Sequence, residues 1–149
     1  MSHSVRVAIL DSGINPCHSH VEGVEGGVWV RPLSGGGTEV LEGIHPDRLG
    51  HGTAAAAVIR WFAPKCKLYS IKVFDRTFST TLPSLLRGLE WAIDAGIEVI
   101  NLSLGTEARR PPLSLEVLCR RACEEGRIVV AAAEGRRCFP AVLATVLGF

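Results

Sequence analysis

The stretch His51-Gly52-Thr53-Ala54-Ala55-Ala56-Ala57-Val58-Ile59 decides how this chain is interpreted. Because Ala has the highest helix propensity, the stretch predicts a buried helix that begins at His51. Gly50 and Gly52 flank the histidine and allow a tight turn, which could hold its imidazole close to other groups. A histidine that merely closes a loop is the alternative. The apolar positions at helical spacing along one side of this helix are Ala55, Val58, Ile59 and Phe62.

A second informative stretch lies about forty residues earlier. Residues 5–10 form a short apolar run bounded by Asp11-Ser12-Gly13, which predicts a buried strand that ends in a turn. In open α/β sheets the carboxyl ends of the strands are where ligands and catalytic groups lie, and Asp11 would be at such an end. The alternative is an ordinary Asx turn, in which Asp11 bonds its own backbone.

The rest of the chain alternates between apolar strands and amphipathic helices. The strands are apolar runs without a clean two-residue alternation, which is typical of a parallel sheet covered by helices on both faces. We therefore predict an α/β fold: one domain over residues 1–149, arranged as a three-layer sandwich with a mostly parallel, doubly wound sheet. The predicted strands are 27–31, 68–74, 97–104, 127–133 and 142–147, the helices are 82–96 and 113–126, and 34–37 is a flexible connection.

Composition narrows the functional classes. The 149 residues are 47% apolar with a formal net charge of +1, which argues against disorder and against a nucleic-acid partner. The N-terminal segment lacks the pattern of a signal peptide, and no apolar window is long enough to span a bilayer, so no membrane partner is expected. The five cysteines are odd in number, which favours reduced thiols and a cytoplasmic location.

Two groups of residues could in principle bind a metal. Cys119 and Cys123 are four residues apart on a predicted helix and could form a zinc site with Cys138, although packing as small apolar residues is the favoured interpretation. The second group shares one loop without fixed spacing, so solvated side chains are favoured; it comprises Cys17, His18, His20 and His45. We predict neither a metal site nor a cofactor.

Eight pieces of the sequence, taken in order, resemble one known family. The chain resembles the subtilisin-like serine peptidases (subtilases, peptidase S8), over what would be the N-terminal two-thirds of the catalytic domain. Asp11-Ser12-Gly13, His51-Gly52-Thr53 and Asn101-Leu102-Ser103-Leu104-Gly105 contribute most to the resemblance. The full set consists of residues 7–14, 51–53, 63–64, 68–73, 88–92, 99–105, 129–133 and 139–142.

The resemblance implies roles for particular residues. A serine hydroxyl is a poor nucleophile until a base removes its proton, and a buried carboxylate holds that base in the right tautomer. The resemblance assigns Asp11 to the carboxylate and His51 to the general acid/base. It also likens Ser103, Leu104 and Gly105 to the strand whose backbone binds an extended peptide or protein substrate. For Ser103, a plain strand-end turn is the alternative.

The chain departs from the family at two places. The family's nucleophilic serine follows in a Gly-Thr-Ser motif that opens a later helix, but the last serine here is Ser114 and no such motif precedes Phe149. Subtilases usually continue the strand after Ala133 with Gly-Asn, whose asparagine stabilises the oxyanion, whereas this chain has Glu134-Gly135. An ionised carboxylate cannot donate a hydrogen bond. We therefore expect the isolated chain to be inactive.

The apolar segment 141–149 leaves two explanations open. The chain is either the front part of a longer subtilase, lacking the part with the nucleophile, or a degenerate relative that needs a partner to cover its C-terminal strand edge. Three functional hypotheses follow. The first is a serine endopeptidase domain with only Asp11 and His51 present; the alternatives are a non-catalytic peptide-binding pseudoprotease and a nucleotide-binding doubly wound domain.

Overall fold

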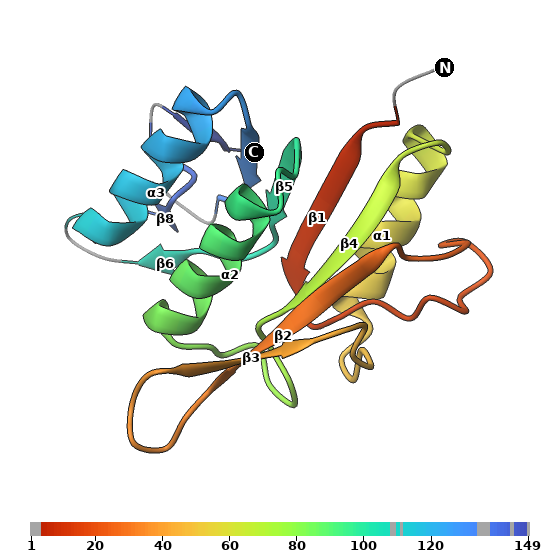
Figure 1. Ribbon diagram of the computed structural model, residues 1–149, viewed down its shortest axis with the longest axis horizontal. Coiled ribbons are helices and arrows are strands. Elements are labelled where there is room, and N and C mark those ends of the chain that lie inside the picture. Colours follow the sequence, from red (N-terminus) through yellow and green to blue (C-terminus); the bar gives the residue numbers. More distant parts are fainter. Residues whose placement is uncertain (1–3, 108–109, 111, 134–137, 144, 149) are drawn as a thin grey trace.

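A computed structural model describes residues 4–107, 110, 112–133, 138–143 and 145–148 (Figure 1). Seven strands form the main sheet: β1 (Arg6–Asp11), β2 (Gly26–Pro32), β3 (Thr38–Glu42), β4 (Lys67–Lys72), β5 (Val99–Leu102), β7 (Ile128–Ala131) and β9 (Leu147–Gly148). Their order is β3-β2-β4-β1-β5-β7-β9, and every neighbouring pair is parallel except β2 with β3. A separate antiparallel pair consists of β6 (Thr106–Glu107) and β8 (Cys138–Phe139).

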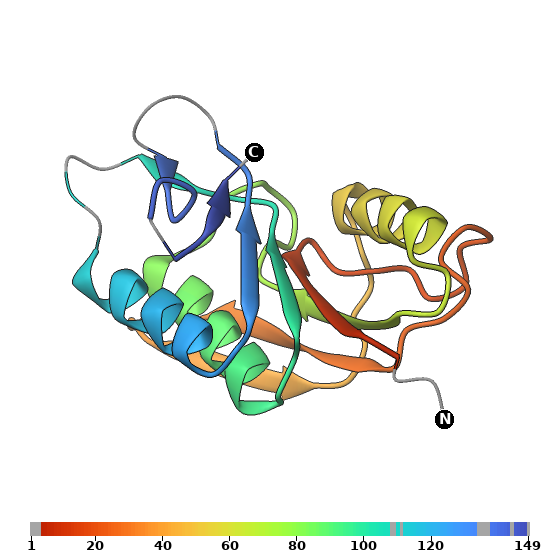
Figure 2. The same cartoon turned by 90° about the horizontal axis from the view of Figure 1, so that it is seen from above.

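Helices lie on both faces of the sheet. Figure 2 shows α2 (Leu82–Asp94) and α3 (Leu113–Glu124) on one face and α1 (His51–Phe62) on the other. This arrangement confirms the predicted α/β fold with a mostly parallel sheet. Within the residues that the structure describes, no helix has the length and apolar character needed to cross a membrane.

Strand β1 is the centre of the sheet and is packed from both sides. Ala8 and Leu10 belong to the core under α2 and α3, while Val7 and Ile9 belong to a second core under α1. Such two-sided burial explains why this strand is a continuous apolar run. The strand ends at Asp11, so the chain leaves the core through a polar residue at the carboxyl edge of the sheet.

The predicted helix over 82–96 is confirmed as α2, Leu82–Asp94. Thr81 is the N-cap, and its side-chain oxygen accepts a hydrogen bond from the Ser84 backbone N–H. The helix ends before Gly96, whose φ of +69° lies in the left-handed region that favours glycine. Local sequence therefore determines both ends of α2.

The predicted buried side of α1 is wrong for two of its four residues. Val58 is 58% exposed and Phe62 is 82% exposed, while Ala55 and Ile59 are partly buried. The helix packs on β1 through small residues, which allow a closer approach to the sheet than the larger side chains would. The buried residues of α1 are Gly52, Thr53 and Ala56.

Two further predictions about strands are wrong. Strand β3 was not predicted; it forms a hairpin with β2 across the 34–37 connection, and its half-exposed residues lack a buried apolar run. The predicted strand over 142–147 is mostly turn, because Val142 and Leu143 bond back to the carbonyls of Cys138 and Pro140. At this end of the chain, the described residues that pair with β7 are Leu147 and Gly148.

Arg60 of α1 connects the helix to the segments on either side of it. Its guanidinium donates to the backbone carbonyls of Val21 at 2.8 Å and Gly23 at 3.3 Å, in the loop before β2. It also donates to Pro64 at 3.0 Å and Cys66 at 2.6 Å, which precede β4. One half-buried side chain thus satisfies four carbonyls from two segments.

We predict that Arg60→Met lowers the free energy of unfolding by about 2 kcal/mol, because hydrogen bonds from a charged donor contribute about 1.5–3 kcal/mol each and these are partly solvated. Urea unfolding followed by circular dichroism measures the change. Arg87→Met is the control: Arg87 pairs with Glu90 on the surface, and its loss should cost less than about 1 kcal/mol. Equal effects of the two substitutions would contradict the structural role of Arg60.

Candidate active site

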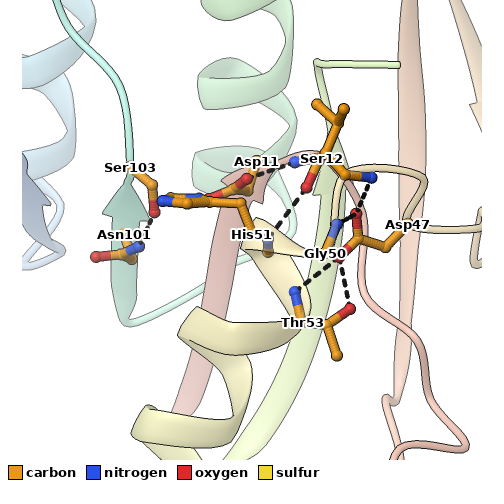
Figure 3. Close-up of polar contacts among 10 residues, drawn as sticks. Asp11, Ser12, Asp47, Gly50, His51, Thr53, Asn101 and Ser103 are labelled. Carbon is orange, nitrogen blue, oxygen red and sulfur yellow. Dashed lines mark hydrogen bonds and ion pairs between the residues drawn. The ribbon is translucent and has the colours of Figure 1, made fainter. Parts of the chain in front are cut away.

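Asp11 and His51 meet at the carboxyl edge of the sheet. The Nδ1 atom of His51, the first residue of α1, lies 2.7 Å from Oδ2 of Asp11, the last residue of β1 (Figure 3). The carboxylate is fully buried, while the imidazole side chain is half exposed. A carboxylate oxygen accepts, so Nδ1 carries a proton; in the neutral form of the ring Nε2 then has the lone pair. The predicted contact between these two residues is therefore present.

The turn after β1 holds the Asp11 carboxylate in place. Its second oxygen, Oδ1, accepts a hydrogen bond of 2.7 Å from the Ser12 backbone N–H. The Ser12 hydroxyl in turn accepts from the backbone N–H of Gly52 at 3.1 Å, which ties the turn to the first residues of α1. The bond to Asp11 thus comes from the next residue, whereas the Asx turn considered as an alternative would bond the N–H two residues on.

Asp47 caps the N-terminal end of α1. Its Oδ1 accepts from the backbone N–H groups of Leu49 and Gly50, and its Oδ2 accepts from the backbone N–H and hydroxyl of Thr53. The bond from Thr53 satisfies a first-turn N–H that has no partner within the helix, and the bonds from Leu49 and Gly50 fix the loop that leads into it. A negative charge at this end of the helix also interacts favourably with the helix dipole. The capped helix therefore presents His51 from a fixed position.

The hydrogen bonds to Asp47 outweigh its burial. Burial by itself would raise the pKa of the Asp47 carboxyl, but the hydrogen bonds from Thr53, Ser12 and Gly50 lower this pKa below its ordinary value of 3.8. The folded state therefore favours the ionised form of Asp47.

A cavity of about 1000 Å³ lies in front of His51. Its lining includes Ser103, Leu104 and Gly105, the predicted substrate-binding residues, which follow β5 directly. The hydroxyl of Ser103 accepts a hydrogen bond of 2.8 Å from the side chain of Asn101. The structure thus brings together all five of the residues predicted for the site. The substrate-binding role of Ser103, Leu104 and Gly105 stays a prediction.

The candidate metal ligands do not form a centre within the described residues, where no group of three or more His, Cys, Asp or Glu side chains could hold a metal ion. Cys119 is buried, whereas Cys123, one turn later on α3, is exposed. Burial raises the pKa of the Cys119 thiol to about 12, so this thiol is protonated and packs as an apolar group. His45 bonds the Leu41 carbonyl through Nε2 at 3.0 Å. The interpretation of Glu134-Gly135 concerns residues outside those described.

Sequence reasoning missed two residues that support the site. Asp47 lies four residues before His51; it is an acidic residue ahead of the helix start, which is a signal for interaction with the helix N-terminus, although the N-cap position is Gly50. Lys72 is the last residue of β4, is followed directly by the apolar Val73 and Phe74, and is only 1% exposed. A fully buried Lys is rare without partners, so its position in the strand was also a signal.

A buried carboxylate that orients a histidine beside an open cavity is the acid–base half of a Ser-His-Asp hydrolase site. Residues 2–136 match the family model described as the subtilase family, peptidase S8. The chain belongs to this family, as the sequence resemblance predicted, and is a subtilisin-like peptidase domain.

The similarity extends over most of this chain but over less than half of the length of two curated relatives and one solved structure. The chain is 35% identical to the thermostable alkaline protease of Halalkalibacterium halodurans over 140 residues, covering 88% of this chain and 36% of that protein. It is 34% identical to subtilisin DY of Bacillus licheniformis, covering 87% and 47%. The crystal structure of a lanthipeptide protease matches its fold with a TM-score of 0.80 at 21% identity, covering 97% of this chain and 47% of that one.

We predict that Gly52→Ala destabilises the protein, although Ala is favoured over Gly by about 1 kcal/mol within a helix. A Cβ at Gly52 would overlap the Gly13 carbonyl oxygen and press on the Asp11 side chain, so the helix must move away from the turn. Thermal unfolding should show a loss of about 2 kcal/mol or more. Ala54→Gly, at an exposed position of the same helix, should cost only about 1 kcal/mol. A stabilised Gly52→Ala variant would show that the helix does not pack this closely.

We predict that Asp47 makes folding more stable at neutral than at acidic pH. Because its folded pKa lies below the unfolded value of 3.8, its contribution is complete above 3.8 and is lost as the pH falls through the folded pKa. Asp47→Asn should therefore reduce the difference in unfolding free energy between pH 6 and low pH, as measured by urea unfolding. Asp94→Asn, at an exposed carboxylate of α2, controls for the loss of one charge. An unchanged pH profile for Asp47→Asn would contradict the prediction.

Proposed function

We propose that this chain supplies Asp11 and His51 to a serine endopeptidase whose nucleophilic serine lies outside these 149 residues. The observation that carries the proposal is the 2.7 Å contact between Asp11 Oδ2 and His51 Nδ1, with the imidazole bordering a cavity. The chain spans 36% and 47% of the length of two relatives that it matches, which leaves room for a separate serine-bearing part.

The chemistry assigned to the two residues follows from their protonation. His51 Nε2 takes the proton of the serine hydroxyl as the serine oxygen attacks the peptide carbonyl, and then gives that proton to the departing amine. Water repeats the sequence and releases the acyl group. Asp11 stays ionised throughout and stabilises the imidazolium that forms in each step. Without the serine, turnover of a subtilisin falls by about 10⁶-fold.

The substrate would be an extended peptide or protein segment. Residues 103–105 follow β5 without being part of the described sheet, and Gly105 is exposed. An extended peptide could pair with their backbone as an added strand, with its side chains in the cavity that these residues share with His51.

The serine would arrive on a helix that covers the open part of the α1 face of the sheet. Parallel sheets are normally covered on both faces, yet Ile128 of β7 is 49% exposed on the α1 side. On the same face of the sheet, α1 exposes Val58 and Phe62, at 58% and 82%. A helix lying over β5 and β7, parallel to α1, would begin at the carboxyl edge near His51. This position agrees with the family pattern of a serine at a helix start.

The edge of the sheet next to β7 needs a similar cover. The two-residue strand β9 is the last in the sheet order, and Leu147 is 63% exposed. An exposed strand edge tends to pair with another chain. We therefore also propose that a partner, or a further segment of polypeptide, covers the edge formed by β9.

A cytoplasmic location belongs to the proposal as well. All five cysteines are free thiols, as expected for a reducing compartment. A tagged chain expressed in its native cells should be recovered in the cytoplasmic fraction, and its recovery outside the cell would exclude this location.

The comparisons do not favour the nucleotide-binding alternative, since the relatives and structures found are proteases. Non-catalytic peptide binding is the remaining competitor, and it differs from the proposal in one respect. It requires no serine nucleophile anywhere in the assembled protein.

We predict that a fluorophosphonate probe does not label the purified 149-residue chain. When tagged chain is isolated from native cells, the probe should label a serine on a longer product of the same gene or on a co-purifying polypeptide. Mass spectrometry identifies the labelled residue. His51→Ala should abolish this labelling, and Asp11→Asn should slow it by about 10⁴-fold because the imidazole loses its tautomer.

His18→Ala is the control, since His18 is an exposed loop histidine and its loss should leave labelling unchanged. Label on a serine of the 149-residue chain that depends on His51 would contradict an external nucleophile. No labelled serine in any native preparation would favour non-catalytic peptide binding.

A further inference from the structure

Lys72 is buried beside the candidate active site. It is the last residue of β4 and is the register partner of Asp11 in β1, yet only 1% of its surface is exposed. Burying an ammonium group is unfavourable unless each of its donors finds a partner. The partners of Lys72 therefore indicate what the residue does.

Two of the three N–H donors of the Lys72 ammonium group have a hydrogen-bond acceptor, and the group also has an ion-pair partner. Nζ donates to the backbone carbonyls of Ser12 at 2.8 Å and Pro46 at 3.1 Å, and it forms an ion pair with Asp75 Oδ1 at 3.3 Å. It also lies 5.6 Å from the ring centroid of Trp29, within the range of a cation–π contact.

The two carbonyls belong to the two segments that carry the candidate catalytic residues. Ser12 follows Asp11 directly, and its backbone N–H bonds the Asp11 carboxylate. Pro46 precedes Asp47, which caps the helix that begins at His51. A single buried group thus connects the turn that holds the carboxylate to the loop that holds the histidine.

Asp75 adds a second connection to the same loop. Its carboxylate, 34% exposed, lies 3.3 Å from Nε of Arg48, which follows Asp47. The ion pairs from Lys72 to Asp75 and from Asp75 to Arg48 therefore join the end of β4 to the loop before α1.

We propose that Lys72 is a positioning residue for the Asp11–His51 pair. Its polar partners are the Ser12 and Pro46 carbonyls and Asp75, not the side chains of Asp11 and His51. It acts by holding the two carbonyls at the separation at which His51 Nδ1 can donate to Asp11. This inference deepens the proposed function because it assigns a role within the same site. The geometry it concerns exists in the chain whether or not a serine is supplied.

The test is the state of the His51 ring in the purified 149-residue chain. Ring ¹⁵N shifts, detected through the carbon-bound ring protons, report which nitrogen carries the proton. In the wild type Nδ1 should be protonated. In Lys72→Met, which keeps the length of the side chain and removes its donors, this preference should be lost and both tautomers should be populated.

Two controls distinguish positioning from a general loss of stability. Lys67→Met removes an exposed lysine of the same strand, and Ile71→Val weakens the core at the adjacent buried residue. Neither should change the His51 tautomer, even where the melting temperature falls. Lys72→Arg, which keeps the charge and donors, should restore part of the preference.

An unchanged His51 tautomer in folded Lys72→Met would overturn the proposal. Should Lys72→Met fail to fold, Asp75→Asn decides, because it removes the ion pair at a partly exposed position. A change in the His51 ring shifts would then support positioning by Lys72, and unchanged shifts would overturn it. Failure of the fluorophosphonate experiment would leave these results standing, so the two proposals can fail separately.

Discussion

The hydrogen bond between Asp11 and His51 is the contact on which the candidate site depends. The Asp11 carboxylate is fully buried, so the free-energy cost of burying its charge must be offset by partners at fixed positions. Those partners come from the Ser12 backbone and from an imidazole forty residues away. The fold must therefore bring the end of β1 and the start of α1 together closely, and Gly52 permits this approach.

The carboxyl edge of the sheet is consequently a layer of buried polar groups that bond one another. Asp11, Ser12, Thr53 and Lys72 are all buried, and each has a hydrogen-bonding partner in this layer. In a low-dielectric environment a satisfied network is rigid, whereas a partly satisfied one is costly. The chemistry proposed for His51 thus relies on residues that touch no substrate. The α1 face of the sheet differs from this layer. Apolar side chains of α1 and β7 are exposed there, and no described segment covers them.

Much of the fold could be predicted because it depends on local signals. The strand ending at Asp11 and the helix 82–96 were recognisable from their apolar residues and, for the helix, from the glycine at its end. Strand β3 was missed because it is a half-exposed edge strand. The apolar segment 142–147 resembled a strand, but local turns occupy most of it. The larger apolar residues of α1 were expected in the core, whereas small residues occupy its buried side.

The sequence by itself determined the α/β class, the family, and the pairing of Asp11 with His51, because each depends on residue types in a fixed order. Only the tertiary structure decided which groups support that pair. Asp47 and Lys72 act through contacts with backbone carbonyls and N–H groups of other segments. Every residue carries such backbone groups, so a sequence cannot indicate which of them a distant side chain will bond; only the packing of the strands and helices brings the partners together.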